Sequence, residues 1–137
     1  MSECVFCKII SGTLLGSFVH QDEICVAFLD INPVNPGHLL VVPTTHVKSV
    51  ADLDDEQAAH LLKIGRDLLR GMQKSSLKLE GANFLISDGE VAGQEVPHTH
   101  LHIVPRFSGD KQRFGFSHSA SKREELDLIA NEIRALL

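Results

Sequence analysis

The chain has 137 residues, of which 43% are hydrophobic and 23% are charged, a composition typical of a globular domain rather than of a disordered chain. Its net charge is −5, whereas proteins that bind nucleic acid through its phosphates are normally basic, so we expect no nucleic-acid partner. The longest aliphatic run, Leu39–Val42, is too short for a membrane span, and the first ten residues do not resemble a signal peptide. We therefore expect one domain over residues 1–137, without a membrane partner, in the cytoplasm.

Five segments are predicted to be β-strands. Residues 17–20 and 24–30 are separated by a polar turn, as in a hairpin. A loop rich in Asn, Pro and Gly then leads to an apolar run over residues 38–42, which indicates a buried strand. Residues 83–87 and 97–107 are the fourth and fifth predicted strands, and a glycine-bearing loop lies between them.

Three segments are predicted to be helical. Residues 4–10 suggest a short helical turn. Residues 55–74 suggest the main helix, with Asp54 as its N-cap and Gln57 completing a capping box. Residues 121–136 suggest an amphipathic C-terminal helix with a capping box between Ser121 and Glu124. The apolar stripe expected on the main helix comprises Leu61, Leu62, Gly65, Leu68, Leu69 and Met72. Because strands and helices do not alternate, we predict an α+β fold with a mostly antiparallel five-stranded sheet, one long helix and a C-terminal helix.

The most informative segment is a row of three histidines at every second position, His98, His100 and His102. On a strand this spacing places all three side chains on one face, with Thr99, Leu101 and Ile103 on the other. Such a row is hard to explain by packing alone, so it indicates a functional site. Two chemistries fit it: a metal site, or nucleophilic attack by an oriented neutral imidazole. In the second case Arg106, His102 and His38 are candidates to contact a phosphate.

The cysteines form a second candidate site. Cys4 and Cys7 have the C-x-x-C spacing that favours a metal site or a redox pair over a structural disulfide. Cys25 lies inside an apolar strand and is expected to be a core residue. His20, His60 and His118 have polar neighbours, and we expect all three at the solvated surface.

The histidine row and three upstream segments resemble the histidine triad (HIT) family. The row lies in Gly93–Arg106, GQEVPHTHLHIVPR, and the other segments are FCKII at Phe6–Ile10, AFLDINP at Ala27–Pro33 and PGHLLVVP at Pro36–Pro43. They follow the family's order and span about residues 4–108. The chain is most similar to the small bacterial members, between the Hint and Fhit branches. The resemblance implies the HIT-like fold and a homodimer.

The resemblance also implies a catalytic cycle. HIT proteins are nucleotide hydrolases and transferases, and the middle histidine, His100, would attack the α-phosphorus to form a covalent nucleotidyl-histidine. His102 would hydrogen-bond the phosphate, and His38 would do the same or protonate the leaving group. The backbone carbonyl of His98, or a neighbouring carbonyl, would fix the tautomer of His100. No cofactor is needed for this chemistry.

The nucleotide pocket is implied residue by residue. Asp30 matches the carboxylate that accepts hydrogen bonds from the ribose, and the loop around Gln94 would present backbone N–H groups to the phosphate. Ser87 and Glu95 depart from the residues usual in the Hint and Fhit branches. The positions that match a purine nucleotide's base, ribose and phosphate contacts are Phe6, Ile9, Leu14, Phe28, Asp30, Ile31, Ser87, Gly93, Gln94 and Glu95.

Some HIT proteins bind structural zinc, and the positions that match their ligands are Cys4, Cys7, His46 and His98. Three functions therefore follow from the resemblance. The first is hydrolysis of nucleoside 5′-phosphoramidates or similar conjugates. The second is hydrolysis of dinucleoside polyphosphates, for which Lys111 and Arg113 could supply positive charge. The third is a zinc-stapled nucleotide-binding module with little turnover.

Overall fold

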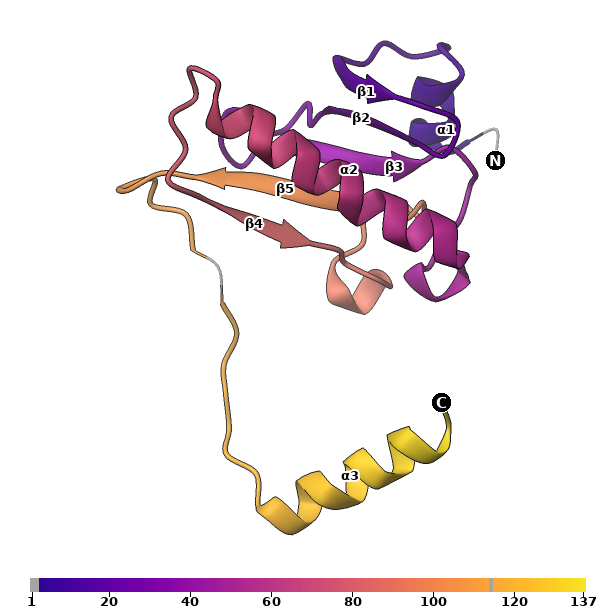
Figure 1. Ribbon diagram of the computed structural model, residues 1–137, viewed down its shortest axis with the longest axis vertical. Coiled ribbons are helices and arrows are strands. Elements are labelled where there is room, and N and C mark those ends of the chain that lie inside the picture. Colours follow the sequence, from indigo (N-terminus) through magenta and orange to yellow (C-terminus); the bar gives the residue numbers. More distant parts are fainter. Residues whose placement is uncertain (1–2, 114) are drawn as a thin grey trace.

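The computed structural model describes residues 3–113 and 115–137 and has the predicted α+β fold (Figure 1). Its five strands form one antiparallel sheet in the order β1-β2-β3-β5-β4. The strands are β1 (Phe18–Gln21), β2 (Cys25–Leu29), β3 (Leu39–Pro43), β4 (Gly81–Leu85) and β5 (Leu101–Arg106). The number of strands and their antiparallel pairing confirm the prediction, although several boundaries differ.

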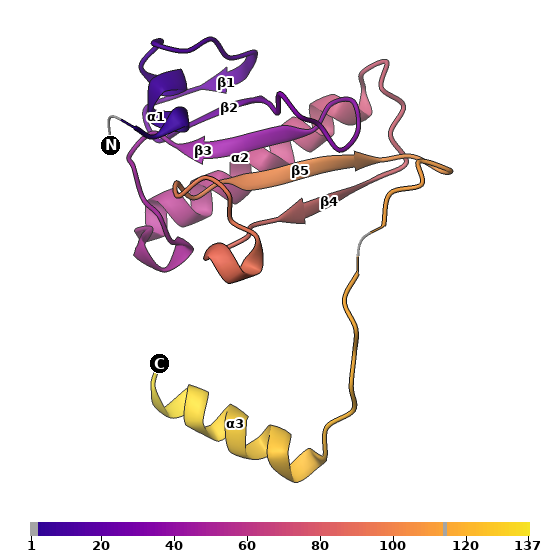
Figure 2. The ribbon, with the colours of Figure 1, turned by 180° about the vertical axis from the view of Figure 1, so that it is seen from behind.

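Helices lie on both sides of this sheet. They are α1 (Val5–Ile10), α2 (Asp55–Gln73) and α3 (Arg123–Ala135), with short 3-10 turns η1 (Val50–Asp52) and η2 (Glu90–Ala92). The long helix α2 crosses one face of the sheet, as the two opposite views of the ribbon show (Figures 1 and 2). Within the described residues, no helix combines the length and hydropathy needed to cross a bilayer.

Helix α2 begins at the predicted capping box. The Asp54 carboxylate accepts from the N–H of Gln57, and the Gln57 side chain accepts from the N–H of Asp54. The buried side of the helix carries Leu61, Ile64, Gly65 and Met72. The predicted stripe was wrong at Leu62, which is 60% exposed, and it missed Ile64.

Gly65 lets α2 pack closely against the sheet. A Cβ atom at this position would lie 3.0 Å from Leu101 Cδ2 and 3.2 Å from Phe84 Cε2. Because both atoms are side-chain carbons of the sheet beneath, any larger residue would push the helix outward. The glycine in the predicted apolar stripe therefore serves packing rather than flexibility.

The two faces of the sheet bury different clusters. The α2-side core lies between α2 and the sheet and consists of Cys25, Ala27, Leu39, Val41, Leu61, Ile64, Met72, Leu101 and Ile103. The α1-side core lies on the other face and consists of Cys4, Phe6, Val26, Phe28, Leu40 and Val42. Successive residues of β2 and β3 alternate between the two cores, because strand side chains alternate between the faces.

The last strand begins later than predicted. Strand β5 starts at Leu101 and not at residue 97, so His98 and His100 precede it and only His102 lies in it. The preceding segment is held by two irregular backbone bonds, from the N–H of Thr99 to the Val47 carbonyl and from the N–H of His98 to the Val96 carbonyl. These bonds replace the pairing with β3, which extends only from Val41 to Leu39.

Helix α3 lies apart from the sheet in both ribbon views (Figures 1 and 2). It begins at Arg123 with Lys122 as N-cap and has no side-chain cap, so the predicted capping box of Ser121 and Glu124 is not formed. None of its residues is buried; Leu126 is 41% exposed, and Ile129 and Ile133 are each 55% exposed. The predicted amphipathic helix is present, but its apolar side has no cover within the described chain.

Candidate active site

The site is built around His100, which lies on the α1 side of the sheet. Its Nδ1 is 2.7 Å from the carbonyl oxygen of His98, and its ring meets the edge of Phe6 with centroids 4.9 Å apart. A carbonyl oxygen only accepts hydrogen bonds, so Nδ1 carries the proton of the neutral ring. The lone pair of His100 is therefore on Nε2, the nitrogen that a nucleophilic role requires.

His102 and His38 form a hydrogen-bonded pair beside it. The Nδ1 of His38 accepts from the N–H of Val34, which leaves the proton of the neutral His38 ring on Nε2. That Nε2 lies 3.0 Å from Nδ1 of His102 and donates to it. His102 then carries its own proton on Nε2, where it can be donated to a bound anion.

His38 is buried, and both of its ring nitrogens already have hydrogen-bond partners within the protein. It is 4% exposed, and both of its ring nitrogens are engaged by Val34 and His102. Its Nε2 also lies 3.6 Å from Oδ2 of Asp30. A direct contact of His38 with a phosphate or a leaving group would therefore require one of these bonds to break.

Burial keeps these imidazoles neutral. Desolvation lowers the pKa of His38 and of His100, because a charged ring is poorly solvated inside the protein. It lowers the pKa of His102 to about 4, and the neighbouring His100 and His38 act in the same direction. The charges of Asp30 and Glu95 oppose the shift at His100, so both carboxylates lie within electrostatic reach of that ring.

His98 faces a different partner. Its Nε2 is 2.9 Å from the carbonyl oxygen of Pro43, so Nε2 donates and Nδ1 offers its lone pair. That Nδ1 lies 3.4 Å from Sγ of Cys4 and 3.6 Å from Sγ of Cys7, and Sγ of Cys7 lies 3.4 Å from Nδ1 of His46. The ligand atoms of Cys4, Cys7, His46 and His98 all lie within 4.8 Å of one another.

These distances suit a tetrahedral zinc ion. With Zn–S of about 2.3 Å and Zn–N of about 2.0–2.1 Å, a tetrahedron has S···N edges of about 3.5 Å. Three of the four S···N distances in the cluster are 3.4, 3.4 and 3.6 Å. The Pro43 carbonyl also fixes the ring orientation of His98, as the outer partner of a metal-bound histidine does.

The residues expected to hold the nucleoside include both buried and exposed side chains. Phe6 and Phe28 are buried and meet edge to face at 5.6 Å. Ile9 is half-buried, whereas Leu14 and Ile31 are exposed at 42% and 91%. Phe6 and Phe28 thus belong to the α1-side core, and the exposed pair can contact a ligand without rearrangement of that core.

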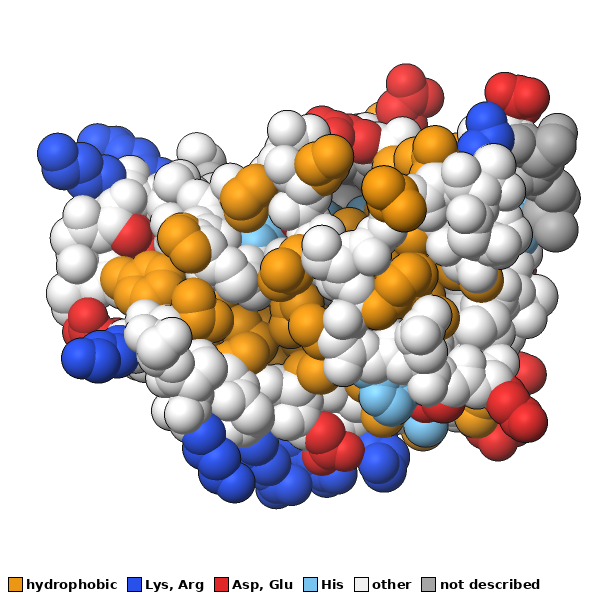
Figure 3. Space-filling view, turned by 90° about the horizontal axis from the view of Figure 1, so that it is seen from above, with side chains coloured by type: hydrophobic (Ala, Val, Ile, Leu, Met, Phe, Trp, Pro, Cys, Tyr) orange, Lys and Arg blue, Asp and Glu red, His pale blue; other side chains and the backbone are white. Residues whose placement is uncertain are grey.

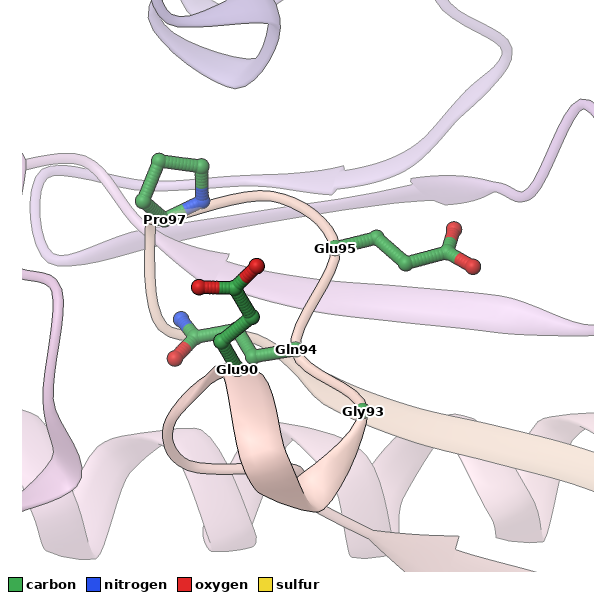
Figure 4. A pocket seen from close by; sticks show the side chains of 5 residues that line it. All are labelled: Glu90, Gly93, Gln94, Glu95 and Pro97. Carbon is green, nitrogen blue, oxygen red and sulfur yellow. The ribbon is translucent and has the colours of Figure 1, made fainter.

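The loop before His98 bounds a cavity of about 580 Å³. It is lined by Glu90, Gly93, Gln94, Glu95 and Pro97, and Figure 4 shows the two glutamates extending from the loop in different directions. None of these lining residues is basic. Glu90 and Glu95 give this cavity negative charge, and the charge of Glu95 acts to raise the pKa of His100.

Two backbone N–H groups of this loop, which were expected to face the phosphate, donate to carbonyl oxygens within the protein instead. The N–H of Gly93 donates to the Glu90 carbonyl, and the N–H of Gln94 donates to the Gly89 carbonyl. The Gln94 side chain is also used within the protein, since it bonds Gly89, Lys48 and Val96. A Cβ atom on Gly93 would lie 4.0 Å from Oγ of Ser87, so Ser87 lies beside the turn, beyond the end of β4.

One candidate from the sequence lies elsewhere. Arg106 is at the far end of β5, where it donates to Asp110, Asn83 and the Gln112 carbonyl. Its guanidinium is therefore engaged in a network at that end of the strand, and a contact with a phosphate would have to compete with these bonds. The sequence reasoning missed Asp22, which joins His20 and His60 in a cluster on the α2 side.

The chain matches the family model described as HIT domain over residues 14–109. It is 40% identical over 131 residues to an uncharacterised HIT-like protein of Methanocaldococcus jannaschii, with 96% of this chain and 98% of the relative covered. The crystal structure of a HIT family protein from Bacillus anthracis superposes with a TM-score of 0.92 at 36% identity, covering 98% and 97% of the two chains.

Two further solved structures bear on chemistry. One is a zinc-bound histidine triad family protein from Mycobacterium smegmatis, with a TM-score of 0.77 at 36% identity over 98% of this chain and 96% of that one. The other is a HIT family hydrolase from Legionella pneumophila, with a TM-score of 0.63 at 33% identity over 74% of this chain and 91% of that one. Structures similar to this chain thus include a zinc-bound protein and a hydrolase.

Proposed function

Because the chain belongs to the histidine triad (HIT) family, we propose that it hydrolyses or transfers nucleoside 5′-phosphate conjugates through a covalent nucleotidyl-histidine on His100. The observation that carries the proposal is the bond from His100 Nδ1 to the His98 carbonyl, which leaves the Nε2 lone pair of a neutral ring available. Nucleophilic catalysis by histidine needs a ring that is both neutral and oriented by its second nitrogen.

The proposed reaction has two displacements. In the first, Nε2 of His100 attacks the α-phosphorus, a P–N bond forms, and the bond from phosphorus to the leaving group breaks with its electron pair going to the leaving group, which takes up a proton from solvent. In the second, water attacks the same phosphorus and loses a proton to solvent, and the P–N bond breaks with its electron pair returning to Nε2, which releases the nucleoside monophosphate. The Nε2–H of His102, set by His38, donates to a phosphate oxygen in both steps.

We propose a purine nucleotide as the bound half of the substrate. Its base would contact Phe6, Ile9, Leu14, Phe28 and Ile31, and its ribose hydroxyls would donate to Asp30. One oxygen of Asp30 accepts from the N–H of Asn32 and the other lies 3.6 Å from Nε2 of His38. The carboxylate is thereby held at the site, with acceptor capacity left for the ribose.

The acidic loop favours an amine as the leaving group. Glu90 and Glu95 line the cavity in the loop that precedes His98, the lining includes no basic residue, and the charge of Glu95 acts on His100. A polyphosphate leaving group would bring several negative charges to these carboxylates, whereas the amine of a phosphoramidate is neutral or becomes positive as it leaves. We therefore place phosphoramidate-type conjugates ahead of dinucleoside polyphosphates.

The first test compares turnover of two substrates by the wild-type chain and by His100→Ala. We expect AMP release from adenosine 5′-phosphoramidate at a higher kcat/KM than from diadenosine triphosphate. We expect His100→Ala to lose at least about 10³-fold in kcat while still binding AMP, because only the nucleophile is removed. The opposite substrate order would favour the Fhit-like alternative. AMP binding without turnover of either substrate would favour the binding module.

We also propose that Cys4, Cys7, His46 and His98 hold a structural Zn²⁺. The support is the S···N spacing given above together with a donor set of two thiols and two imidazoles, which is typical of closed zinc sites. The ion would join α1 to the segment after β3 and to the residues before His100. It would supply rigidity and no step of the reaction.

The assembly we propose is a homodimer. The supporting observation is the apolar side of α3, where Leu126, Ile129 and Ile133 are exposed and have no cover in the described chain. A second copy would cover apolar surface that monomers rarely leave open. Light scattering of the full chain tests this, with twice 15.1 kDa expected and a monomer mass contradicting it.

A further inference from the structure

A cluster of His20, Asp22 and His60 lies away from both the triad and the cysteines. His20 is in β1, Asp22 is in the turn between β1 and β2, and His60 is in α2. Oδ2 of Asp22 lies 2.6 Å from Nε2 of His20 and 2.7 Å from Nε2 of His60. The ligand atoms of these three residues and Sγ of Cys25 all lie within 4.8 Å of one another.

The strand is irregular where it delivers His20 to this cluster. Phe18 packs against the α1-side core, and regular alternation would place His20 on that same face. The pairing of β1 with β2 instead shifts register between Phe18 and His20. Such an irregularity turns a side chain to the other face, and here it brings His20 to the α2 side, where His60 lies.

The carboxylate of Asp22 is fixed by the backbone. Its Oδ1 accepts from the N–H groups of Ile24 and Cys25, each at 2.8 Å. The other oxygen, Oδ2, is thereby directed at the two imidazoles.

The cluster is accessible from solvent. The side chains of His20 and Asp22 are each 29% exposed, and that of His60 is 21% exposed. Viewed from above, the molecule shows histidine side chains at its surface next to acidic and hydrophobic groups (Figure 3). An ion can therefore enter without unfolding, and water can complete its coordination.

We propose that His20, Asp22 and His60 form a second divalent-cation site, distinct from the cysteine site, that takes Zn²⁺ or a similar borderline cation through two imidazole nitrogens and one carboxylate oxygen. Two histidines and a carboxylate with an open position make a known type of ligand set for such ions. The bound ion would connect the β1–β2 hairpin to α2 on the face opposite the triad.

Binding requires a small opening of the cluster. The N···O distances of 2.6 and 2.7 Å are hydrogen-bond lengths, whereas a tetrahedral zinc ion needs N···O edges of about 3.3–3.4 Å. Half-exposed His20 and His60 side chains can supply this movement while Asp22 stays on its backbone bonds. Each imidazole then carries its proton on Nδ1 and gives the Nε2 lone pair to the ion, so no proton or electron is lost.

Cys25 lies beneath the cluster as a thiol rather than as a fourth ligand. Its side chain is fully buried in the α2-side core, where it packs among apolar side chains. The proposed ligand set of two imidazoles and one carboxylate therefore contains no thiolate. This property separates it from the cysteine site, since cobalt(II) bound by thiolates has strong sulfur-to-metal charge-transfer absorption and cobalt(II) bound only by imidazole and carboxylate does not.

The test is equilibrium dialysis of the full metal-free chain against Co²⁺, with absorption spectra of the loaded protein. We expect two ions per chain in the wild type, one of them without thiolate absorption. His60→Gln and His20→Gln should each lose that ion and keep the thiolate band. His118→Gln, at an exposed histidine elsewhere, is the matched control and should bind as the wild type does.

The outcomes distinguish the two metal proposals. Loss of an ion in both variants, with a wild-type far-UV circular dichroism spectrum, supports the second site even if the wild type shows no thiolate band. Unchanged stoichiometry in folded His60→Gln and His20→Gln overturns it. A wild type that binds one ion, with thiolate absorption, also overturns it. The cluster would then only hydrogen-bond the β1–β2 hairpin to α2.

Discussion

The two faces of the sheet are made by the same strands and differ in how they are held together. The α2-side core is apolar, and its residues recur with the periods of a strand and a helix, as Leu101 and Ile103 do against Leu61 and Ile64. The α1 side carries an apolar core as well, but it also carries the imidazoles of His98, His100, His102 and His38.

Hydrogen bonds arrange the polar part of the α1 side, and they join segments far apart in the chain. His98 is bound to Pro43, and His38 to His102, so β3 and its surroundings orient the residues before and within β5. The difference shows that apolar burial builds the scaffold, while a directional network sets which nitrogen of each ring is reactive. Substitutions in the apolar core should therefore lower the free energy of unfolding, whereas substitutions in the hydrogen-bond network should lower the reaction rate.

The sharpest test of the scaffold side is Ile103→Ala. Ile103 is fully buried against α2, so its truncation leaves a cavity and should lower the free energy of unfolding by about 2–5 kcal/mol. Urea unfolding measures this. Leu62→Ala, on the exposed side of the same helix, is the control and should change stability by no more than about 0.5 kcal/mol. Equal effects of the two substitutions would contradict the burial assigned to α2.

Removal of zinc tests whether the α1 side is also stabilised by metal. A chelator should lower the Tm of the wild type by about 5–10 °C, as expected for a ligand that binds only the folded state and is present well above its Kd. Cys7→Ser should have the lower Tm already and should not respond further to the chelator. A wild-type Tm that does not change with the chelator, in protein shown to contain zinc, would contradict a structural role for the ion.

Acid should weaken the α1 side through His102. The folded pKa of about 4 lies below the ordinary value of 6.5, so the unfolded chain takes up this proton first as the pH falls. The contribution of His102 to stability is therefore lost progressively from about pH 6.5 down to about pH 4. Unfolding in chelator at several pH values should show a steeper loss for the wild type than for His102→Asn. Parallel curves would count against a buried, neutral His102.

The smallest expected effect concerns the acidic loop. Glu95→Gln removes one negative charge that acts on His100 and should raise kcat/KM for diadenosine triphosphate relative to adenosine 5′-phosphoramidate by about fivefold, which is ~1 kcal/mol. Glu56→Gln, in the first turn of α2, is the matched control and should leave the ratio unchanged. A ratio that stays constant in Glu95→Gln would exclude Glu95 from leaving-group selection.

Local signals predicted much of the scaffold. Asp54 and Gln57 predict the start of α2, because a capping box is recognised from two residues and their spacing alone. Leu62 and Ile64 were assigned the wrong way round, because the sequence gives the helical period without the direction from which the sheet approaches. Strand β5 was predicted too long, because the bond from Thr99 to Val47 that interrupts it joins distant segments.

The candidate site was harder to predict, because its hydrogen bonds also join segments that are distant in the chain. The spacing of His98, His100 and His102 pointed to a site, but the separate tasks of their nitrogens depend on Pro43, His98 and His38 as partners. His20 and His60 were expected at the solvated surface, and each alone has no distinctive neighbours in sequence. His20 is two positions from Asp22 in the sequence, but only the fold brings His60 to the same carboxylate, across 38 positions.

The most direct test of the central claim is rapid-quench intact mass of the protein mixed with adenosine 5′-phosphoramidate, beside His100→Ala. We expect a transient mass increase of one adenylyl group in the wild type, followed by AMP release, and no such increase in His100→Ala. Peptide mapping should place the group on His100. AMP release without any adduct on the wild type, or an adduct that persists in His100→Ala, would contradict nucleophilic attack by His100.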